Sequence, residues 1–154
     1  QLENLLAEEL KLFDESKRVW LEDESKTIGR VFLDLKFWNN LRLSPLFVID
    51  LPKAVRVERL VNEYGENRME GLEESITNIK RRLGNEHWKN AIDAVREKDF
   101  AKVAQLTLHY YDKAYDKGIA LKETKEIFRF PFEEDDVEKI AITLIESANT
   151  KYGN

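Results

Sequence analysis

Hydrophobic residues in the first part of the chain follow two different spacings. Over residues 2–13 they recur every three or four positions, which predicts an amphipathic helix. The apolar run 19–21 predicts a short strand that ends at three consecutive acids and is followed by a turn. A second short strand is predicted at 30–33, and a helix around 37–41 before a Ser-Pro break. The start of the chain therefore alternates helices with strands.

A continuous apolar run at residues 46–51 carries a single acid near its end. A run of this length is typical of a strand buried on both faces, as in parallel sheets. Pro52 then begins a helix at a position where its missing N–H costs nothing, and this helix is predicted to end at Gly65.

The second half of the chain is mostly helical in pattern. Three consecutive helices with short connections are predicted over residues 66–111, the third capped by Asp99. Residues 112–125 are polar and are predicted to be irregular. A half-buried strand at 126–130 and an amphipathic helix at 137–148 follow. The order of elements indicates a helix-rich α/β protein with a mostly parallel sheet.

Composition narrows the function classes. The 154 residues suffice for about one domain, and the net charge of −5 requires any nucleic-acid contact to come from a local basic patch. Cysteine is absent and the two histidines lie on separate segments, which excludes thiolate chemistry and argues against a zinc site. With no apolar run long enough for a membrane span and no signal peptide, we expect a cytoplasmic protein without membrane contact. Residue 1 is Gln, so we expect a fragment of a longer protein.

Three acids, Glu22, Asp23 and Glu24, follow the first predicted strand and precede Ser25. Carboxylates at the end of a buried strand are costly to desolvate, which leaves two interpretations. The acids either form a solvated strand end, with Asp23 or Ser25 capping a turn, or they face a metal ion, a phosphate-bearing ligand or a basic partner. Since alternate strand residues point to opposite faces, Glu22 and Glu24 can share one side, or Asp23 can face it alone.

The stretch WLEDESKTIGR, residues 20–30, closely resembles the EDES-x-x-IG motif of the tRNA 2-selenouridine synthases. Four further passages resemble segments of this family in the same order: Glu3–Leu6, Leu51–Tyr64 with its P-x-x-x-R-V-x-R-L pattern, Lys80–Gly84 with KRRLG, and the tyrosine-rich Tyr110–Asp116. The resemblance covers residues 1–118 well and the last strand and helix more loosely.

This resemblance implies an activity. Members of the family join an N-terminal rhodanese-like domain, which bears a reactive cysteine, to a C-terminal P-loop domain. They replace the sulfur of wobble 2-thiouridine in tRNA with selenium from selenophosphate, through a geranylated intermediate. The present sequence has no cysteine and no G-x-x-x-x-G-K-[ST] loop. We therefore expect it to be inactive and without bound ligand when isolated, and to depend on missing rhodanese and P-loop portions.

The resemblance also implies a domain organisation. Residues 1–65 are expected to form the C-terminal part of a truncated P-loop NTPase-like α/β core with a mostly parallel sheet. Residues 66–118 are expected to form a helical subdomain, and 119–154 a final strand and helix that return to the core. Because strands that lack a neighbour leave apolar edges unpaired, we expect the fragment to form a homodimer.

In P-loop folds, a strand beside the phosphate loop ends in an acid that holds Mg²⁺ or orients water. The resemblance thus implies catalytic roles for Glu22 and Asp23, with Asp23 as a Mg²⁺ ligand in the full-length protein. It implies ligand or phosphate contacts for Glu24, Ser25 and Arg30, and selenophosphate and geranyl diphosphate as co-substrates.

Two arginines on the helix after residue 52, Arg56 and Arg59, share a face because they lie three residues apart. They contact the phosphates of a diphosphate or of tRNA, or they pair with Asp50, Glu58 or Glu63.

A run of three cations, Lys80, Arg81 and Arg82, lies at a predicted helix end. These residues contact the tRNA backbone, or they occupy a helix C-terminus simply because cations are stable there.

The tyrosines Tyr110, Tyr111 and Tyr115 are spaced as on one helix. They stack on a base, line an apolar pocket for a prenyl chain, or pack in the core, and the core is predicted for Tyr111. His87 and His109 have no partner nearby in the sequence, so no chemistry is assigned to them.

Three hypotheses for the function follow. The leading one is a fragment of a tRNA-modifying transferase that contributes its nucleotide- or diphosphate-binding and tRNA-binding region. The alternatives are a fragment of a small-molecule or nucleotide kinase-like P-loop enzyme, which the fold outline also allows, and a non-catalytic RNA-binding adaptor.

Overall fold

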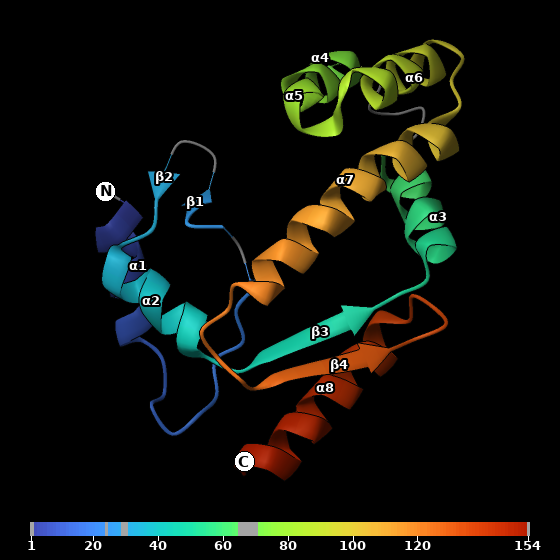
Figure 1. Ribbon diagram of the computed structural model, residues 1–154. Helices are drawn as coiled ribbons and strands as arrows, with labels where there is room; N and C mark the ends of the chain where they lie inside the picture. The colour runs from blue at the N-terminus through green and yellow to red at the C-terminus, as the bar shows by residue number, and fades with distance from the viewer. Residues whose placement is uncertain (1, 24, 29–30, 65–70, 154) are drawn as a thin grey trace. The chain divides into compact units, whose positions relative to one another are not determined.

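The computed structural model describes residues 2–23, 25–28, 31–64 and 71–153 (Figure 1). Contacts between residues divide the chain into two compact units. The terminal unit comprises residues 1–48, 122–130 and 137–154, and the helical unit comprises residues 49–121 and 131–136. The chain thus enters the helical unit twice. Within the described ranges, no helix has the length and apolar character needed to cross a membrane.

The terminal unit joins both ends of the chain to short strands. Its elements are α1 (Leu2–Lys11), β1 (Thr27–Ile28), β2 (Val31–Phe32), α2 (Leu35–Leu43), the start of β3 (Leu46–Asp50), most of β4 (Ile127–Pro131) and α8 (Val137–Tyr152). The helix predicted around 37–41 begins after Asp34, whose carboxylate accepts from the N–H groups of Lys36 and Phe37.

Two small sheets are present. In the first, β1 and β2 pair antiparallel, with Thr27 opposite Phe32. In the second, β3 and β4 run in the same direction (Figure 1). At its start, the Leu46 N–H donates to the Glu126 carbonyl at 2.8 Å. The prediction of a helix-rich chain with a parallel sheet is confirmed at this coarse level.

Aromatic side chains hold the terminal unit around β3. The ring of Phe47 stacks on that of Phe130, with centroids 5.5 Å apart, and it also contacts Phe128. Trp20 meets the same ring edge-on at 5.2 Å. Ile49, in contrast, is exposed, so the prediction that this strand is buried on both faces is wrong. β4 is its one paired neighbour in the described part of the chain, which leaves part of the strand uncovered.

Residues 19–21 are not a strand, contrary to the prediction. The segment is instead held by side chains, because Trp20 packs on Phe47 while the backbone joins neither of the two sheets. Arg18, just before it, caps the far end of α8: its guanidinium donates to Asn149 Oδ1 at 2.9 Å and to the carbonyls of Ala148 and Gly153.

The described residues of the helical unit form five helices. These are α3 (Lys53–Tyr64), α4 (Leu72–Asn78), α5 (Lys80–Leu83), α6 (Asn85–Arg96) and α7 (Phe100–Ala120). The first of the three helices predicted over residues 66–111 is divided at Ile79, which leaves helical geometry with φ −96° and ψ 4°. Gly84 then takes φ 88°, a conformation that glycine adopts without strain, and this allows α6 to start immediately.

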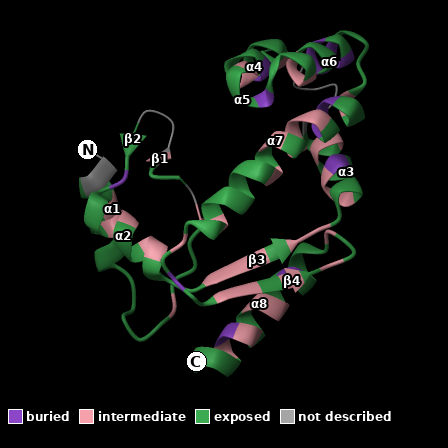
Figure 2. Cartoon of the chain, in the orientation of Figure 1, coloured by how far each residue is buried: buried purple, intermediate pink, exposed green. Residues whose placement is uncertain are grey.

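α6 and α7 form an antiparallel hairpin around an apolar core. Ala91 and Ala94 are fully buried on α6 and let α7 approach closely. The predicted N-cap at Asp99 is confirmed, since its carboxylate accepts from the Lys102 N–H at 3.0 Å. Figure 2 shows buried residues gathered on α5, α6 and the adjoining part of α7. The core residues are Ile76, Leu83, Ala91, Ile92, Ala94, Val95 and Val103.

The prediction that residues 112–125 are irregular is wrong for most of this segment, because α7 continues to Ala120. Leu108, Tyr111, Tyr115 and Ile119 keep a helical spacing through the polar stretch. The polar residue Asp112 is used for an ion pair with α3, described below, so its polarity does not indicate a loop.

Candidate functional site

Asp23 is held by a buried lysine. Its Oδ1 accepts a hydrogen bond from Lys122 Nζ, and the Lys122 side chain is only 5% exposed. A buried ammonium is costly without a partner, so Asp23 supplies the charge that Lys122 requires. Glu22, next to it, is exposed.

Other members of the predicted acidic site are placed only in part. The Ser25 hydroxyl donates to the Thr27 carbonyl at 2.5 Å, which caps the turn before β1. Glu24 and Arg30 lie outside the described residues. Within the described ranges, no group of three or more His, Cys, Asp or Glu side chains converges in a way that could hold a metal ion.

Arg56 and Arg59 both pair with carboxylates in the helical unit. Arg56 makes a two-pronged contact with Asp112, with N···O distances of 2.6 and 3.3 Å, and also donates to the Leu51 carbonyl. Arg59 bridges Glu63 at 3.1 Å and Asp135 at 3.1 Å. Of these partners, Glu63 was one of the predicted alternatives. The other two lie far away in the sequence, where local spacing could not indicate them.

Lys80, Arg81 and Arg82 differ from these arginines. Lys80 Nζ lies 3.5 Å from the centroid of the Trp88 ring, and Arg82 donates to the Tyr110 hydroxyl at 3.3 Å. Arg81 is exposed. Among the described residues, none of the three forms an ion pair with a carboxylate. We call these three residues, which have no carboxylate partner among the described residues, the α5 cation cluster.

His87 and His109 are brought together by the α6–α7 hairpin. Their rings stack with centroids 5.5 Å apart and planes 11° from parallel. No chemistry is predicted for either histidine from the sequence, because neither has a partner nearby in the chain. A hairpin prediction with a fixed register could have found this pair.

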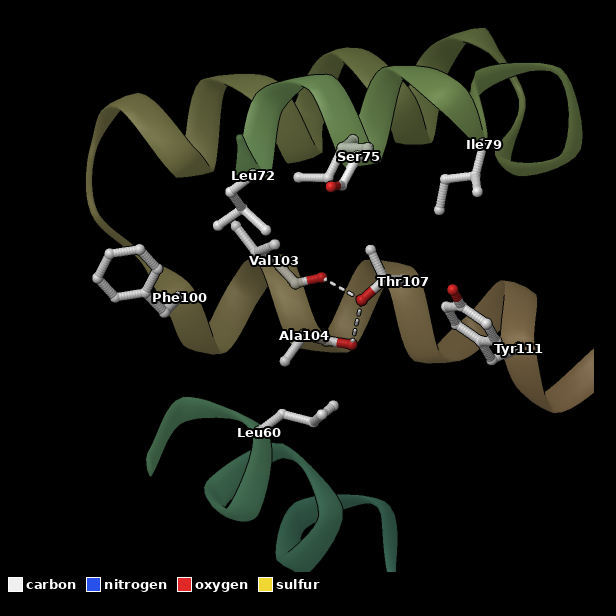
Figure 3. Close-up of a pocket in the computed structure, with 10 residues that line it drawn as sticks. Leu60, Leu72, Ser75, Ile79, Phe100, Val103, Ala104, Thr107 and Tyr111 are labelled. Atoms are coloured by element: carbon white, nitrogen blue, oxygen red, sulfur yellow. Dashed lines mark hydrogen bonds between the residues drawn. The ribbon is translucent and has the colours of Figure 1, made fainter. Parts of the chain in front are cut away.

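An apolar pocket of about 240 Å³ lies between α3, α4 and α7 (Figure 3). The Thr107 hydroxyl donates to the Val103 and Ala104 carbonyls, so it presents no unmet donor to the pocket. Tyr111 lines one side and is 45% exposed, so its predicted place in the core is wrong. The residues that line the pocket are Leu60, Leu72, Ser75, Ile76, Ile79, Phe100, Val103, Ala104, Thr107 and Tyr111.

Comparison with known proteins bears on these features. The profile of a family described as the tRNA 2-selenouridine synthase AAA domain matches residues 1–146. A protein named tRNA 2-selenouridine synthase from Shewanella sediminis is 28% identical, over 82% of this chain and 43% of that protein. Proteins of the same name are 27% identical in a Sulfurovum species, over 82% of the chain and 43% of that protein, and 25% identical in Psychromonas ingrahamii, over 86% and 44%.

The chain thus spans about two fifths of the length of these curated relatives. No solved structure matches it. The profile match extends over nearly the whole chain, including the acidic stretch, α5 and the final strand, and it confirms the predicted resemblance. The chain belongs to the tRNA 2-selenouridine synthase AAA-domain family.

Proposed function

We propose that the chain is the diphosphate- and tRNA-binding part of a transferase that converts wobble 2-thiouridine in tRNA to 2-selenouridine. The observation that carries this proposal is the family match over residues 1–146. Relatives of the whole protein are named for this product, and the chain corresponds to less than half of each. Selenophosphate and geranyl diphosphate are the co-substrates, and tRNA as substrate implies action in the cytoplasm.

The α5 cation cluster supports a tRNA-binding role. Unpaired cations contribute to nucleic-acid affinity by releasing counterions from phosphates, whereas cations already paired with carboxylates contribute less. Lys80, Arg81 and Arg82 belong to the first kind. Arg56 and Arg59 belong to the second, so we assign them first to holding α3 in place. Any phosphate contact that they make requires these ion pairs to rearrange.

The apolar pocket supports binding of the geranyl chain. Its lining is mainly aliphatic and aromatic, and the Thr107 hydroxyl in it already donates to the Val103 and Ala104 carbonyls. Such a pocket favours a hydrocarbon over a polar group. We place the geranyl group here, between α3, α4 and α7.

A Mg²⁺ site does not fit the described residues taken alone. Asp23 already neutralises Lys122, and a cation beside that ammonium would be repelled. Mg²⁺ is commonly bound by one or two carboxylates together with substrate phosphates. The Mg²⁺ predicted for the full-length protein would therefore need ligands beyond Asp23.

Exposed apolar side chains on the terminal unit require a cover. Leu5, Leu12, Phe13 and Phe32 are all exposed there. Large apolar side chains that a fold leaves exposed are candidates for contact with another protein surface. We propose that they pack either on the rest of the full-length protein or on a second copy, as the predicted homodimer requires.

The proposed function is tested with the full-length protein that contains this chain. Supplied with selenophosphate, geranyl diphosphate and tRNA bearing 2-thiouridine, it should form 2-selenouridine, detected by mass spectrometry of the digested nucleosides. Omitting geranyl diphosphate should leave 2-thiouridine in place. Unchanged tRNA in the complete mixture contradicts the proposal, and tRNA binding without conversion favours the RNA-binding adaptor instead.

Filling the pocket should block the geranyl step. Ser75 lines the pocket and is itself exposed, so Ser75→Trp can occupy the mouth without disturbing the core. We expect this change to slow formation of geranylated tRNA by about tenfold or more, which corresponds to about 1.4 kcal/mol of lost chain burial. The control is Glu74→Trp, at the residue that precedes Ser75 on α4 and does not line the pocket. Equal rates for both variants would place the geranyl group elsewhere.

A further inference from the structure

The stacked histidines lie at the open end of the α6–α7 hairpin. His87 is in the first turn of α6, and His109 is near the middle of α7. Among the described residues, neither imidazole takes part in a hydrogen bond, so their ring nitrogens are available to a ligand. His109 is exposed and His87 is half-buried. A pair of this kind from two helices is a preformed arrangement, because each helix is fixed by the apolar core beneath it.

Positive charge surrounds the pair. Lys113 lies one turn beyond His109 on α7, and Lys53 at the start of α3 also acts on His109. Asp112 is the carboxylate that faces the same ring, but both of its oxygens accept from Arg56. Arg82 on α5 contacts Tyr110, the residue next to His109. The charges that reach His109 from α3, α6 and α7 are thus mainly cationic.

This field lowers the pKa of His109 below its ordinary value. The main cause is Lys113, followed by partial burial and by His87 and Lys53, while Asp112 acts in the opposite direction. The imidazole is therefore neutral near neutral pH in the free protein. A bound anion would offset the lysines and raise the pKa, so anion binding and proton uptake favour each other.

We propose that a site for a backbone phosphate of the tRNA is formed by His87, His109, Lys53 and Lys113, which we call the histidine patch. This site takes up a proton when the phosphate binds. The proposal rests on the proposed function for the identity of the RNA. Arg82 of the α5 cation cluster contacts Tyr110, the residue that follows His109 on α7, so we infer that a single polyanion can engage both. A free phosphate or diphosphate has the same chemistry, and the experiment separates these two sources.

The first arm measures the affinity of the chain for tRNA between about pH 5.5 and 8 at constant ionic strength. Uptake of one proton on binding changes this affinity by at most about tenfold per pH unit. The wild-type protein should bind about three- to tenfold more tightly at pH 6 than at pH 7.5. The double variant His87→Gln/His109→Gln should lose this dependence and keep its affinity at pH 8. Lys113→Gln should weaken binding at every pH.

Titration of carboxylates or of the tRNA itself cannot produce this difference in pH dependence. The wild-type protein and the variants contain the same carboxylates and bind the same tRNA. An unchanged pH dependence in the double variant would overturn the proposal. So would a double variant whose affinity falls equally at all pH values, because that indicates a structural role for the histidines.

The second arm uses inorganic phosphate and follows the two imidazole C2 protons by NMR. Phosphate, compared with chloride at equal ionic strength, should raise the pKa of His109. A raised pKa without any tRNA binding would mean that the site serves a free phosphate ligand and that the proposed function fails. If the pKa of His109 changes with neither phosphate nor tRNA, the histidine patch does not bind phosphate and the proposal is wrong.

Discussion

Replacing Lys80, Arg81 and Arg82 together with alanine should sharply weaken binding of tRNA to the chain. Each phosphate contact that is lost should lower the slope of log affinity against log salt by about 0.7 to 0.9, so three contacts correspond to a change of about two to three. At low salt the affinity itself should fall by about ten- to a hundredfold. The reason is that the described structure provides no carboxylate partner for these cations. Fluorescence anisotropy over a salt series measures both quantities.

The control is a triple variant with the same change in charge on the terminal unit. Lys17, Lys36 and Lys125 are all exposed there, and their replacement by alanine should leave the salt slope nearly unchanged. If both triple variants lose affinity equally, tRNA binding follows net charge and has no local site. If the α5 variant keeps its slope, its cations serve only to stabilise the helix end.

The change Asp23→Asn should destabilise the protein although it preserves the shape of the side chain. It removes the negative charge beside Lys122, whose ammonium is buried, while Asp23 itself is 33% exposed. Breaking a buried pair from one side is costly, and partial exposure of Asp23 reduces the cost to about 1–3 kcal/mol in the free energy of unfolding. Urea denaturation followed by circular dichroism measures it.

Two comparisons identify the ion pair as the cause. Glu22→Gln, at the exposed neighbouring acid, should change the free energy of unfolding by less than about 0.5 kcal/mol. The double variant Asp23→Asn/Lys122→Met should recover most of the loss, because it leaves no buried charge unpaired. An Asp23→Asn variant as stable as Glu22→Gln would show that Lys122 does not depend on this carboxylate. Activity measurements on Asp23 variants must therefore be corrected for stability.

Local patterns predicted most of the secondary structure. The presence of a strand before Pro52, the helix after it and the cap at Asp99 depend on neighbouring residues alone, and these predictions are confirmed. The burial of that strand on both faces depends on its neighbours in the fold, and this part of the prediction is wrong. The prediction of a strand at residues 19–21 failed because an apolar run does not indicate whether its backbone pairs with another strand. The prediction that residues 112–125 are irregular failed because polarity does not distinguish a loop from a polar helix face. Asp112, for example, lies on a helix and pairs with Arg56.

The candidate site was less accessible to sequence reasoning. The predicted site residues are mostly charged, and the partners of charged side chains depend on the tertiary fold. Lys122 lies 99 residues from Asp23, and Asp112 lies 56 residues from Arg56. The family resemblance indicated the chemistry without indicating which cations remain unpaired. That distinction, which separates the α5 cation cluster from Arg56, required the structure.

Photocrosslinking from α5 tests most directly whether the helical unit contacts tRNA. A photoreactive aromatic amino acid at position 81, in the full-length protein, should crosslink to tRNA on irradiation, since Arg81 is exposed and lies between Lys80 and Arg82. The same amino acid at position 138, exposed on α8, is the matched control. We predict a tRNA adduct from position 81 that unlabelled tRNA competes away, at a yield well above that from position 138. Equal yields from the two positions, or no adduct from position 81, would contradict it.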